Sequence, residues 1–244
     1  MYLCIDDVTV KYGSTVAVQN ANLVLSAGVH ALLGPNGAGK SSLLEVIATL
    51  RKPSSGSFHF TDNNPDSANQ NDYTGMDLRS ILGYLPQENL PKSRFTVREH
   101  LAYVCWLKQI PDGDVSAEVD RLINLAELSD KADATIASLS GGMRRRVGIA
   151  SALVGSPRLL ILDEASAGLD MAQRDSLRRI VATVARDAIV LTSTHIVEDI
   201  IDIADTLTVM SRGTFMFSGG WDEFCHTRQL PELKAQYLEL VGER

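Results

Sequence analysis

The chain has 244 residues, of which 45% are hydrophobic, and a net charge of −7 from 23 basic and 30 acidic residues. This length and apolar content suffice for one large α/β domain. The acidic balance excludes general nucleic-acid binding, which requires a basic face, so no nucleic-acid partner is expected. The longest apolar runs, at 147–155 and 159–162, are far shorter than the roughly 18 to 20 residues that cross a bilayer. The start of the chain lacks the features of a signal peptide, so a cytoplasmic protein is expected.

The cysteines are Cys4, Cys105 and Cys225, an odd number without CxxC spacing. This argues against a disulfide framework or a zinc site. We expect reduced and mostly buried thiols.

The first third of the chain alternates strand-like and helix-like patterns. Apolar β-like runs come first, and helical spacing follows, with Leu43, Leu44, Ile47 and Leu50 on one face. A stretch rich in Asn, Asp and Ser then predicts a long polar loop. The predicted strands are 3–10, 15–25, 28–33, 56–60 and 80–86, and the predicted loop is 61–75.

From Thr96 to Gly155 the pattern is mainly helical. Thr96 and Glu99 form a capping-box signature, and Ser116 opens a second amphipathic helix. Further on, strands alternate with helices, which predicts a largely parallel α/β sheet with the helical block as an insertion. A hairpin is expected around Arg212-Gly213. The predicted elements are helices 96–110, 116–128, 141–155, 171–185 and 221–244, strands 158–164 and 188–195, and hairpin 205–220.

The strongest motif lies between strand 28–33 and the following helix. It fits G-x-x-x-x-G-K-[ST], in which glycines let backbone N–H groups surround phosphates and the helix N-terminus adds positive potential. We expect Lys40 to reach the β- and γ-phosphates and Ser41 to bind Mg²⁺, so ATP and Mg²⁺ are the predicted cofactors. The predicted nucleotide-binding residues of this motif and the position after it are Gly34, Pro35, Asn36, Gly37, Ala38, Gly39, Lys40, Ser41 and Ser42.

Two acidic residues, Asp163 and Glu164, end the apolar run LLILDE. In P-loop nucleotidases an acidic residue at this strand end helps to hold Mg²⁺, the role expected of Asp163. Glu164 is placed to polarise an attacking water as a general base. The alternative is a strand end with two solvated acids.

Ser140, Gly141 and Gly142 directly precede a helix-like run. Glycine in a helix costs about 1 kcal/mol relative to alanine, so two adjacent glycines require a reason. A group that approaches the backbone closely would provide one. The alternative is a loop with a glycine-rich helix start.

This stretch, LSGGM followed by an arginine-rich helix, resembles the signature motif of ATP-binding cassette (ABC) ATPases, whose usual form is LSGGQ. The resemblance covers nearly the whole chain in the family's order. It implies that Tyr12 stacks on adenine, that Gln87 belongs to the Q-loop, and that Gly168-Leu169-Asp170 is the D-loop. It also implies that His195 is the switch histidine at the γ-phosphate. The alternatives are a surface aromatic at Tyr12, an ordinary polar residue at Gln87 and a satisfied core histidine at His195.

Site roles follow from this resemblance. Glu164, His195 and Gln87 are the expected catalytic residues, and Gln87 joins Ser41 and Asp163 as an expected Mg²⁺ ligand. Asp170 is expected at the nucleotide site.

The resemblance also implies the architecture. It predicts one ABC ATPase domain over 1–244, with a nucleotide-binding core and antiparallel β subdomain at 1–87 and 156–244 and a helical signature subdomain at 88–155. Two cassettes of this family pack head to tail, with each ATP between one P-loop and the other cassette's signature. We therefore expect a homodimer on ATP binding, in which the backbone at 140–142 contacts the partner's nucleotide. In this interpretation the two glycines are costly within one chain and useful only across the dimer.

Some positions depart from the usual pattern. Met143 replaces the signature glutamine, as it often does in ABC subunits that pair with separate export permeases. The sequence DEAS replaces the commoner DEPT but keeps Glu164, so hydrolysis is expected. The run Arg144, Arg145 and Arg146 is expected to form a solvated helix face with one or two ion pairs, the alternative being that it binds acidic groups.

The resemblance thus implies an ATP-hydrolysing ABC transporter subunit of the bacterial export type, at the cytoplasmic face of the membrane, that drives a separate permease. Docking is expected near 87–107, where Phe95, Tyr103 and Trp106 are candidates, with core packing as their alternative fate. A tail too short for an importer's regulatory domain favours export of a drug, peptide or lipid-like compound. The alternatives are a soluble ABC ATPase, such as one in iron–sulfur assembly, and a non-hydrolysing binding module.

Overall fold

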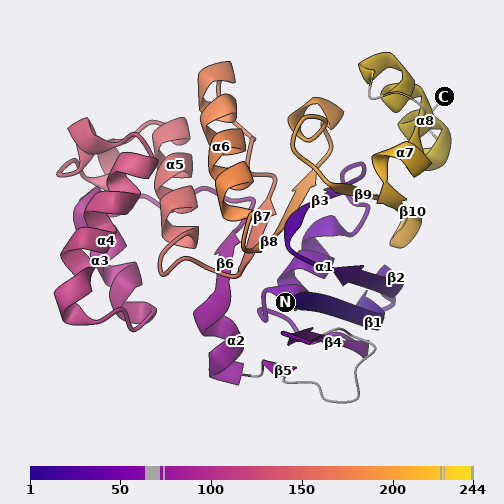
Figure 1. Cartoon of the computed structure of the whole chain (residues 1–244), viewed down its shortest axis with the longest axis horizontal. Coiled ribbons are helices and arrows are strands. Elements are labelled where there is room, and N and C mark those ends of the chain that lie inside the picture. The colour runs from indigo at the N-terminus through magenta and orange to yellow at the C-terminus, as the bar shows by residue number, and fades with distance from the viewer. Residues whose placement is uncertain (64–71, 74, 226, 228, 243–244) are drawn as a thin grey trace.

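The structure, a computed structural model, describes residues 1–63, 72–73, 75–225, 227 and 229–242 (Figure 1). Two sheets form its centre. The larger has the strand order β10-β9-β3-β8-β7-β6 and the smaller the order β2-β1-β4-β5. The strands are β1 (Tyr2–Tyr12), β2 (Thr15–Leu25), β3 (Gly28–Leu33), β4 (Ser55–Thr61), β5 (Asp72–Tyr73), β6 (Leu82–Leu85), β7 (Leu159–Asp163), β8 (Ile189–Thr194), β9 (Thr206–Ser211) and β10 (Thr214–Gly220).

The larger sheet is parallel except for β10, which pairs antiparallel with β9. The smaller sheet is antiparallel and is built on the N-terminal strands β1 and β2. These two sheets with their helices confirm the predicted α/β fold class, with a mainly parallel sheet and an N-terminal antiparallel part. The hairpin at Arg212-Gly213 is also confirmed, with both residues at positive φ as tight two-residue turns require.

The larger sheet separates two apolar cores, and the alternation of side chains along its strands explains why. On β7, Leu160 and Leu162 belong to one core, whereas Leu159 and Ile161 belong to the other. Successive side chains of a strand point to opposite faces, so a strand buried on both sides reads as a continuous apolar run. The second core also contains buried residues of β1 and of helix α1, so the antiparallel sheet covers that face.

Helices supply the rest of the first core. In Figure 1, α3, α4 and α5 gather at one side of the molecule, away from the antiparallel sheet. The capping box predicted for α3 is confirmed, because Thr96 accepts from the Glu99 N–H while the Glu99 carboxylate accepts from the Thr96 N–H. The helices are α1 (Lys40–Ile47), α2 (Gly75–Ile81), α3 (Val97–Leu107), α4 (Asp112–Leu125), α5 (Gly141–Ala152), α6 (Met171–Val184), α7 (Trp221–Phe224) and α8 (Leu230–Val241), with 3₁₀ turns at Ser129–Lys131, Ile136–Ser138 and Val197–Asp199.

Some expected boundaries were wrong. The predicted strand 80–86 is in fact the end of α2 followed by the four-residue strand β6. Helix α4 begins at Asp112 rather than Ser116, because Pro111 supplies its N-cap and two aspartates occupy its first turn, where the positive end of the helix favours them. The helical tail is broken at Cys225, which is extended. Most of the predicted loop 61–75 lies outside the described residues; of the rest, Asp72–Tyr73 forms β5.

All three cysteines are buried, as expected. Among the described residues, no helix combines the length and apolarity that crossing a membrane demands. Nor do the described His, Cys, Asp and Glu side chains form a group of three or more that suits a metal ion.

The register of the parallel strands determines where the site residues emerge. Leu33 pairs with Thr194, Asp163 with Ser193, and Leu85 with Leu162. The carboxyl ends of β3, β8, β7 and β6 therefore lie at nearly one level. The segments that begin at Gly34, His195, Glu164 and Pro86 leave the sheet side by side at this edge.

The environment of His30 on β3 leads to a prediction of how the stability of the protein depends on pH. Its Nε2 donates to the Ser26 carbonyl at 2.7 Å, and its Nδ1 lies 2.8 Å from the Thr206 hydroxyl, so the neutral ring satisfies both partners. Burial lowers the pKa of His30 below its ordinary value of 6.5. The unfolded chain therefore takes up a proton as the pH falls through about 6.5, whereas the folded chain resists it, and stability present above that pH is lost below it.

We expect His30→Asn to flatten this pH dependence. Urea unfolding at pH 8 and at pH 5.5 measures the effect, with the pH 8 value as the reference for any loss of packing. Wild type should lose more unfolding free energy than the variant between the two pH values. Equal losses in both chains would contradict the assignment.

Candidate functional site

The loop 34–39 joins β3 to α1, and its glycines fit it closely to the chain around it. A Cβ on Gly34 would lie 2.3 Å from the Met210 carbonyl oxygen, and one on Gly39 would lie 2.1 Å from that of Ala17. Gly39 is also the N-cap of α1, with φ of 104° and no side-chain cap. The first N–H groups of α1 therefore have no side-chain cap and are directed toward the loop, the arrangement that binds anions at helix N-termini.

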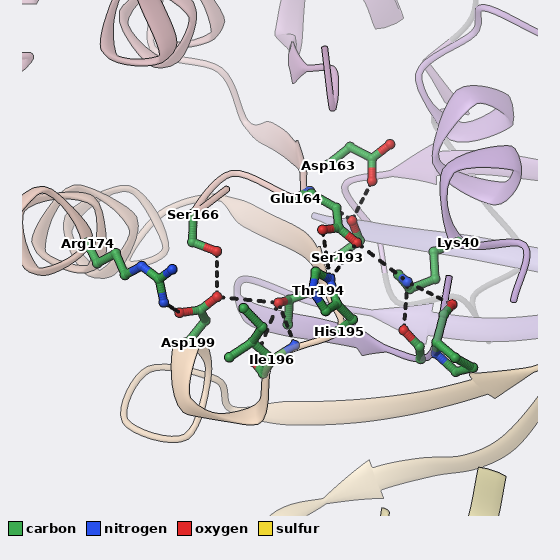
Figure 2. Close-up of polar contacts among 12 residues, drawn as sticks. Lys40, Asp163, Glu164, Ser166, Arg174, Ser193, Thr194, His195, Ile196 and Asp199 are labelled. Carbon is green, nitrogen blue, oxygen red and sulfur yellow. Dashed lines mark hydrogen bonds and ion pairs between the residues drawn. The ribbon is translucent and has the colours of Figure 1, made fainter. Parts of the chain in front are cut away.

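Lys40, Glu164 and His195 form a compact charged cluster at the strand ends (Figure 2). Lys40 is buried, donates to the carbonyls of Gly34 and Pro35 at 2.7 and 3.2 Å, and has its Nζ 3.7 Å from Glu164 Oε1. Burial lowers the pKa of Lys40, while Glu164 and then Asp163 act to raise it. The Nδ1 of His195 lies 2.9 Å from Glu164 Oε2. The Glu164 carboxylate is thus the shared partner of the Lys40 and His195 side chains.

The backbone of Glu164 is strained. Glu164 follows β7 and has a φ of 51°. This left-handed conformation is uncommon for residues other than Gly, Asn and Asp. Two bonds from its N–H, to the Ser193 carbonyl at 3.2 Å and the Ser193 hydroxyl at 3.0 Å, hold the residue in place. The Ser193 hydroxyl also donates to Asp163. Strain of this kind is of order 1–3 kcal/mol and clusters at active sites.

Two pockets meet at this edge of the sheet. One, of about 240 Å³, is lined by Ala17, Asn36, Gly37, Ala38, Gly39, Lys40, Ser41, Ser42, Gln87 and Glu164. The other, of about 500 Å³, contains Ser41, Gln87 and Asp163 in its lining, together with residues of α1, the segment 84–91 and α5. The three expected Mg²⁺ ligands therefore face one space, and their hydroxyl, amide and carboxylate oxygens are the hard donors that Mg²⁺ prefers.

Tyr12 lies beside the phosphate loop, at the end of β1. Its hydroxyl is 3.1 Å from the Ser42 hydroxyl, and the Arg51 guanidinium covers one face of its ring at 4.3 Å. The side chain is 41% exposed, so it keeps an open surface. Stacking on adenine stays a prediction; Arg51, a cation–π partner, was not foreseen from the sequence.

The signature residues begin α5. Ser140 is its N-cap and accepts from the Met143 N–H at 3.2 Å, which leaves the Ser140 O–H able to donate elsewhere. A Cβ on Gly141 would meet nothing within 4 Å, whereas one on Gly142 would lie 2.9 Å from Oε1 of Gln173. That atom is the end of a flexible side chain that can move aside, so the expectation that the two glycines serve a dimer stays a prediction. Gly141 has no such neighbour.

Asp170 is also a helix cap. It accepts from the Gln173 N–H at 2.9 Å, and the Gln173 side chain returns a bond to its backbone, so the two form a capping box on α6. The signature residues 140–142 and Asp170 lie outside the lining of both pockets described above. Their predicted contacts would therefore be with a nucleotide other than the one bound by the phosphate loop of the same chain.

The arginine run does not form the solvated face that was expected. Arg145 is 2% exposed and donates to the carbonyls of Pro86, Gln87, Asp163, Glu164 and Ala165. Arg144 donates to the Leu139 carbonyl, and Arg146 to those of Ala126 and Glu127. The correction has a physical cause: backbone carbonyls near the strand ends accept every N–H group of the Arg145 guanidinium, so the side chain can be buried with its donors satisfied.

A second network behind the site was not foreseen. Figure 2 shows Asp199 accepting from Ser166, Thr194 and Arg174. Arg174 also donates to the Leu169 carbonyl, so the network ties the D-loop to the strand end that carries His195. The sequence offered no signal for Asp199, because its partners lie on three separate segments.

Comparison with known proteins identifies the family. The sequence model of the ABC transporter family matches residues 18–167, more than half of the chain. The chain is 34% identical over 216 residues to the sulfate/thiosulfate import ATP-binding protein CysA of Thermosynechococcus vestitus, covering 87% of the chain and 62% of that protein. It is also 34% identical over 214 residues, at the same coverage, to the Nod factor export ATP-binding protein I of Rhizobium meliloti. The chain thus spans about 62% of the length of these curated relatives.

A solved structure described as the ATP-binding subunit of an ABC transporter superposes with a TM-score of 0.83, over 98% of this chain and 99% of that one. At 24% identity this likeness shows the fold. Together with the family match and the spacing of the motifs around one sheet edge, it establishes that the chain belongs to the ABC transporter ATP-binding family.

Proposed function

We propose that the chain binds and hydrolyses ATP and drives a separate membrane permease, which would hold it at the cytoplasmic face of the membrane. The observation that carries this proposal is the pocket that brings residues 36–42 of the phosphate loop together with Gln87 and Glu164. The phosphates lie along the N–H groups of the loop and the start of α1, and Lys40 neutralises the β- and γ-phosphates. The names of the two relatives, one an import and one an export ATP-binding protein, support a transport role.

Glu164 acts as the general base. Its carboxylate is held 3.7 Å from Lys40 and 2.9 Å from His195. The γ-phosphate offers both residues a new anionic partner, which frees the carboxylate to accept a proton from the attacking water. His195, whose ring is 43% exposed, then contacts the γ-phosphate.

Mg²⁺ would be held by Ser41, Gln87 and Asp163, and when bound it neutralises charge on the β- and γ-phosphates. These side chains come from α1, the Q-loop segment and the end of β7. The Ser193 hydroxyl, bonded to Asp163, orients that carboxylate.

ATP also joins two copies of the chain in this proposal. The signature residues and the phosphate loop face different parts of the surface, and the open space at Gly141 leaves its backbone accessible to a second subunit's γ-phosphate. The positive end of α5 points at the same place.

The permease contact lies on α3 and the residues just before it. Phe95, Tyr103 and Trp106 form an aromatic row with ring centroids 6.1 and 5.9 Å apart, and they are 48%, 46% and 67% exposed. Core packing of these side chains, the alternative considered from the sequence, is wrong. Three adjacent exposed aromatic rings are suited to bury an apolar segment of a partner.

We infer that the direction of transport is export, of a drug, peptide or lipid-like compound. Met143 and the segments LGYLPQE and LSGGMRRR, which resemble export-type subunits, support this direction. ATP-dependent uptake by inside-out vesicles that carry the permease tests it, because export moves the compound into such vesicles. Uptake by right-side-out vesicles would indicate import.

Replacing the general base should increase ATP affinity as well as stop turnover. In Glu164→Gln the carboxylate no longer competes with phosphate for Lys40 and His195, so ATP should bind several-fold more tightly while hydrolysis falls at least a hundredfold. Calorimetry in EDTA and a phosphate-release assay measure the two effects. Glu239→Gln, which makes the same charge change at an exposed site on α8, is the control, and equal affinities of the two variants would contradict the proposal.

Gly141→Ala should prevent ATP-driven dimerisation without lowering the stability of the folded chain. The added methyl group meets no neighbour in the chain, and alanine is favoured in helices by up to about 1 kcal/mol, so thermal stability should be kept or raised. In the Glu164→Gln background, light scattering should show ATP-driven doubling of mass that Gly141→Ala abolishes. Doubling that persists in the double variant would place the phosphate contact elsewhere.

Trp106→Ser should weaken the permease contact without altering hydrolysis by the isolated chain. We expect sedimentation with membranes that contain the permease to fall at least tenfold. Leu238→Ser, an exposed apolar residue on α8, is the matched control and should sediment as wild type does. A similar loss in both variants would show that the aromatic row is not the contact.

A further inference from the structure

Every N–H group of the Arg145 guanidinium donates a hydrogen bond to the backbone. A guanidinium has five N–H donors in a planar fork. Nη1 donates to Pro86 at 2.6 Å and Gln87 at 3.1 Å, and Nη2 to Asp163 at 2.7 Å and Glu164 at 2.8 Å. Nε donates to Ala165 at 3.2 Å. All five acceptors are main-chain carbonyls, and they belong to two separate segments.

The two segments are the places where β6 and β7 stop pairing. Their last ladder partners are Leu85 and Leu162. Pro86 has no N–H to extend the ladder, and beyond this point the chains diverge toward the Q-loop and toward Glu164. Arg145 spans the gap, so its rigid fork fixes the spacing between the backbones of residues 86–87 and 163–165.

Three of the five carbonyls belong to residues with predicted roles in the reaction, namely Gln87, Asp163 and Glu164. A backbone held at its carbonyl limits where the side chain of the same residue can point. The same helix carries Gly141 at its start, one turn before Arg145. A shift of α5 relative to the sheet must therefore move these two segments with it or break several bonds at once.

We propose that Arg145 is a positioning residue that makes the start of α5, the Q-loop backbone and the backbone of the general base move as one unit. This inference rests on the proposed ATP hydrolysis. Binding of a second subunit at the start of α5 is thereby transmitted to Glu164 and Gln87 through five hydrogen bonds. A lysine cannot replace the bridge, because its ammonium is a point charge with three donors and no planar fork.

The neighbouring Arg146 provides a matched control. It also donates to two backbone carbonyls, those of Ala126 and Glu127, but these lie at the end of α4. Its bonds therefore hold α4 and α5 together and do not reach the sheet. Arg145→Lys and Arg146→Lys make the same chemical change on the same helix.

We expect Arg145→Lys to lower kcat for ATP at least tenfold and to change the KM and the ATP affinity in EDTA less than twofold. Arg146→Lys should change kcat less than twofold. Amide hydrogen exchange adds a positional readout: residues 87–90 and 164–167 should exchange faster in Arg145→Lys, whereas α1 should not change. A kcat for Arg145→Lys equal to that of Arg146→Lys, or exchange that rises equally throughout the chain, would overturn the proposal.

Two further comparisons keep the test decisive. If the wild-type chain does not hydrolyse ATP, the proposed function fails, and the exchange pattern still tests the bridge. If Arg145→Lys does not fold, arginine ¹⁵N spectra of the wild-type chain serve instead. They should contain a guanidinium with separate, slowly exchanging Nη signals, and rapid exchange of every arginine Nη would overturn the bridge.

Discussion

The alignment of four parallel strand ends is the constraint from which the site follows. Because Leu33 pairs with Thr194, Asp163 with Ser193 and Leu85 with Leu162, the chain leaves the sheet four times at one level. Each exit carries a different chemical group: a phosphate loop, a histidine, a pair of carboxylates and an amide. In open α/β sheets, ligands bind beyond the carboxyl ends of the strands for this reason. A register slip of one residue would also exchange the two cores on which the sheet rests.

Much of this edge could be predicted from the sequence. Glu164 and His195 directly follow β7 and β8, and Lys40 follows β3 after the loop 34–39, so the topology of a parallel sheet brings the three together. The bonds from Arg145 could not be predicted, because a run of three arginines looks alike in sequence whichever of them points inward. The start of α4 at Asp112 was missed for a related reason. A proline and two aspartates gave the true helix signal, whereas Ser116 resembled a cap four residues later.

Two residues of the family motifs have structural roles within the single chain. Ser140 caps α5 and Asp170 caps α6. Loss of such a cap costs about 0.5–2 kcal/mol, so a substitution at either residue changes stability as well as any contact with a second subunit. Gly141 differs, because the space above it is open, and it is the position at which the two kinds of effect are separable.

The positive φ of Glu164 implies a conflict between the stability of this fold and its activity. The backbone at position 164 suits Asn or Gly, and glutamate occupies it against its own conformational preference. Selection for thermostability alone would favour replacement of Glu164, the proposed general base. At this one residue, the carboxylate that the proposed reaction needs therefore costs conformational stability of the backbone. Inactive variants with Asn or Gly at position 164 are therefore expected to be more thermostable than the active protein.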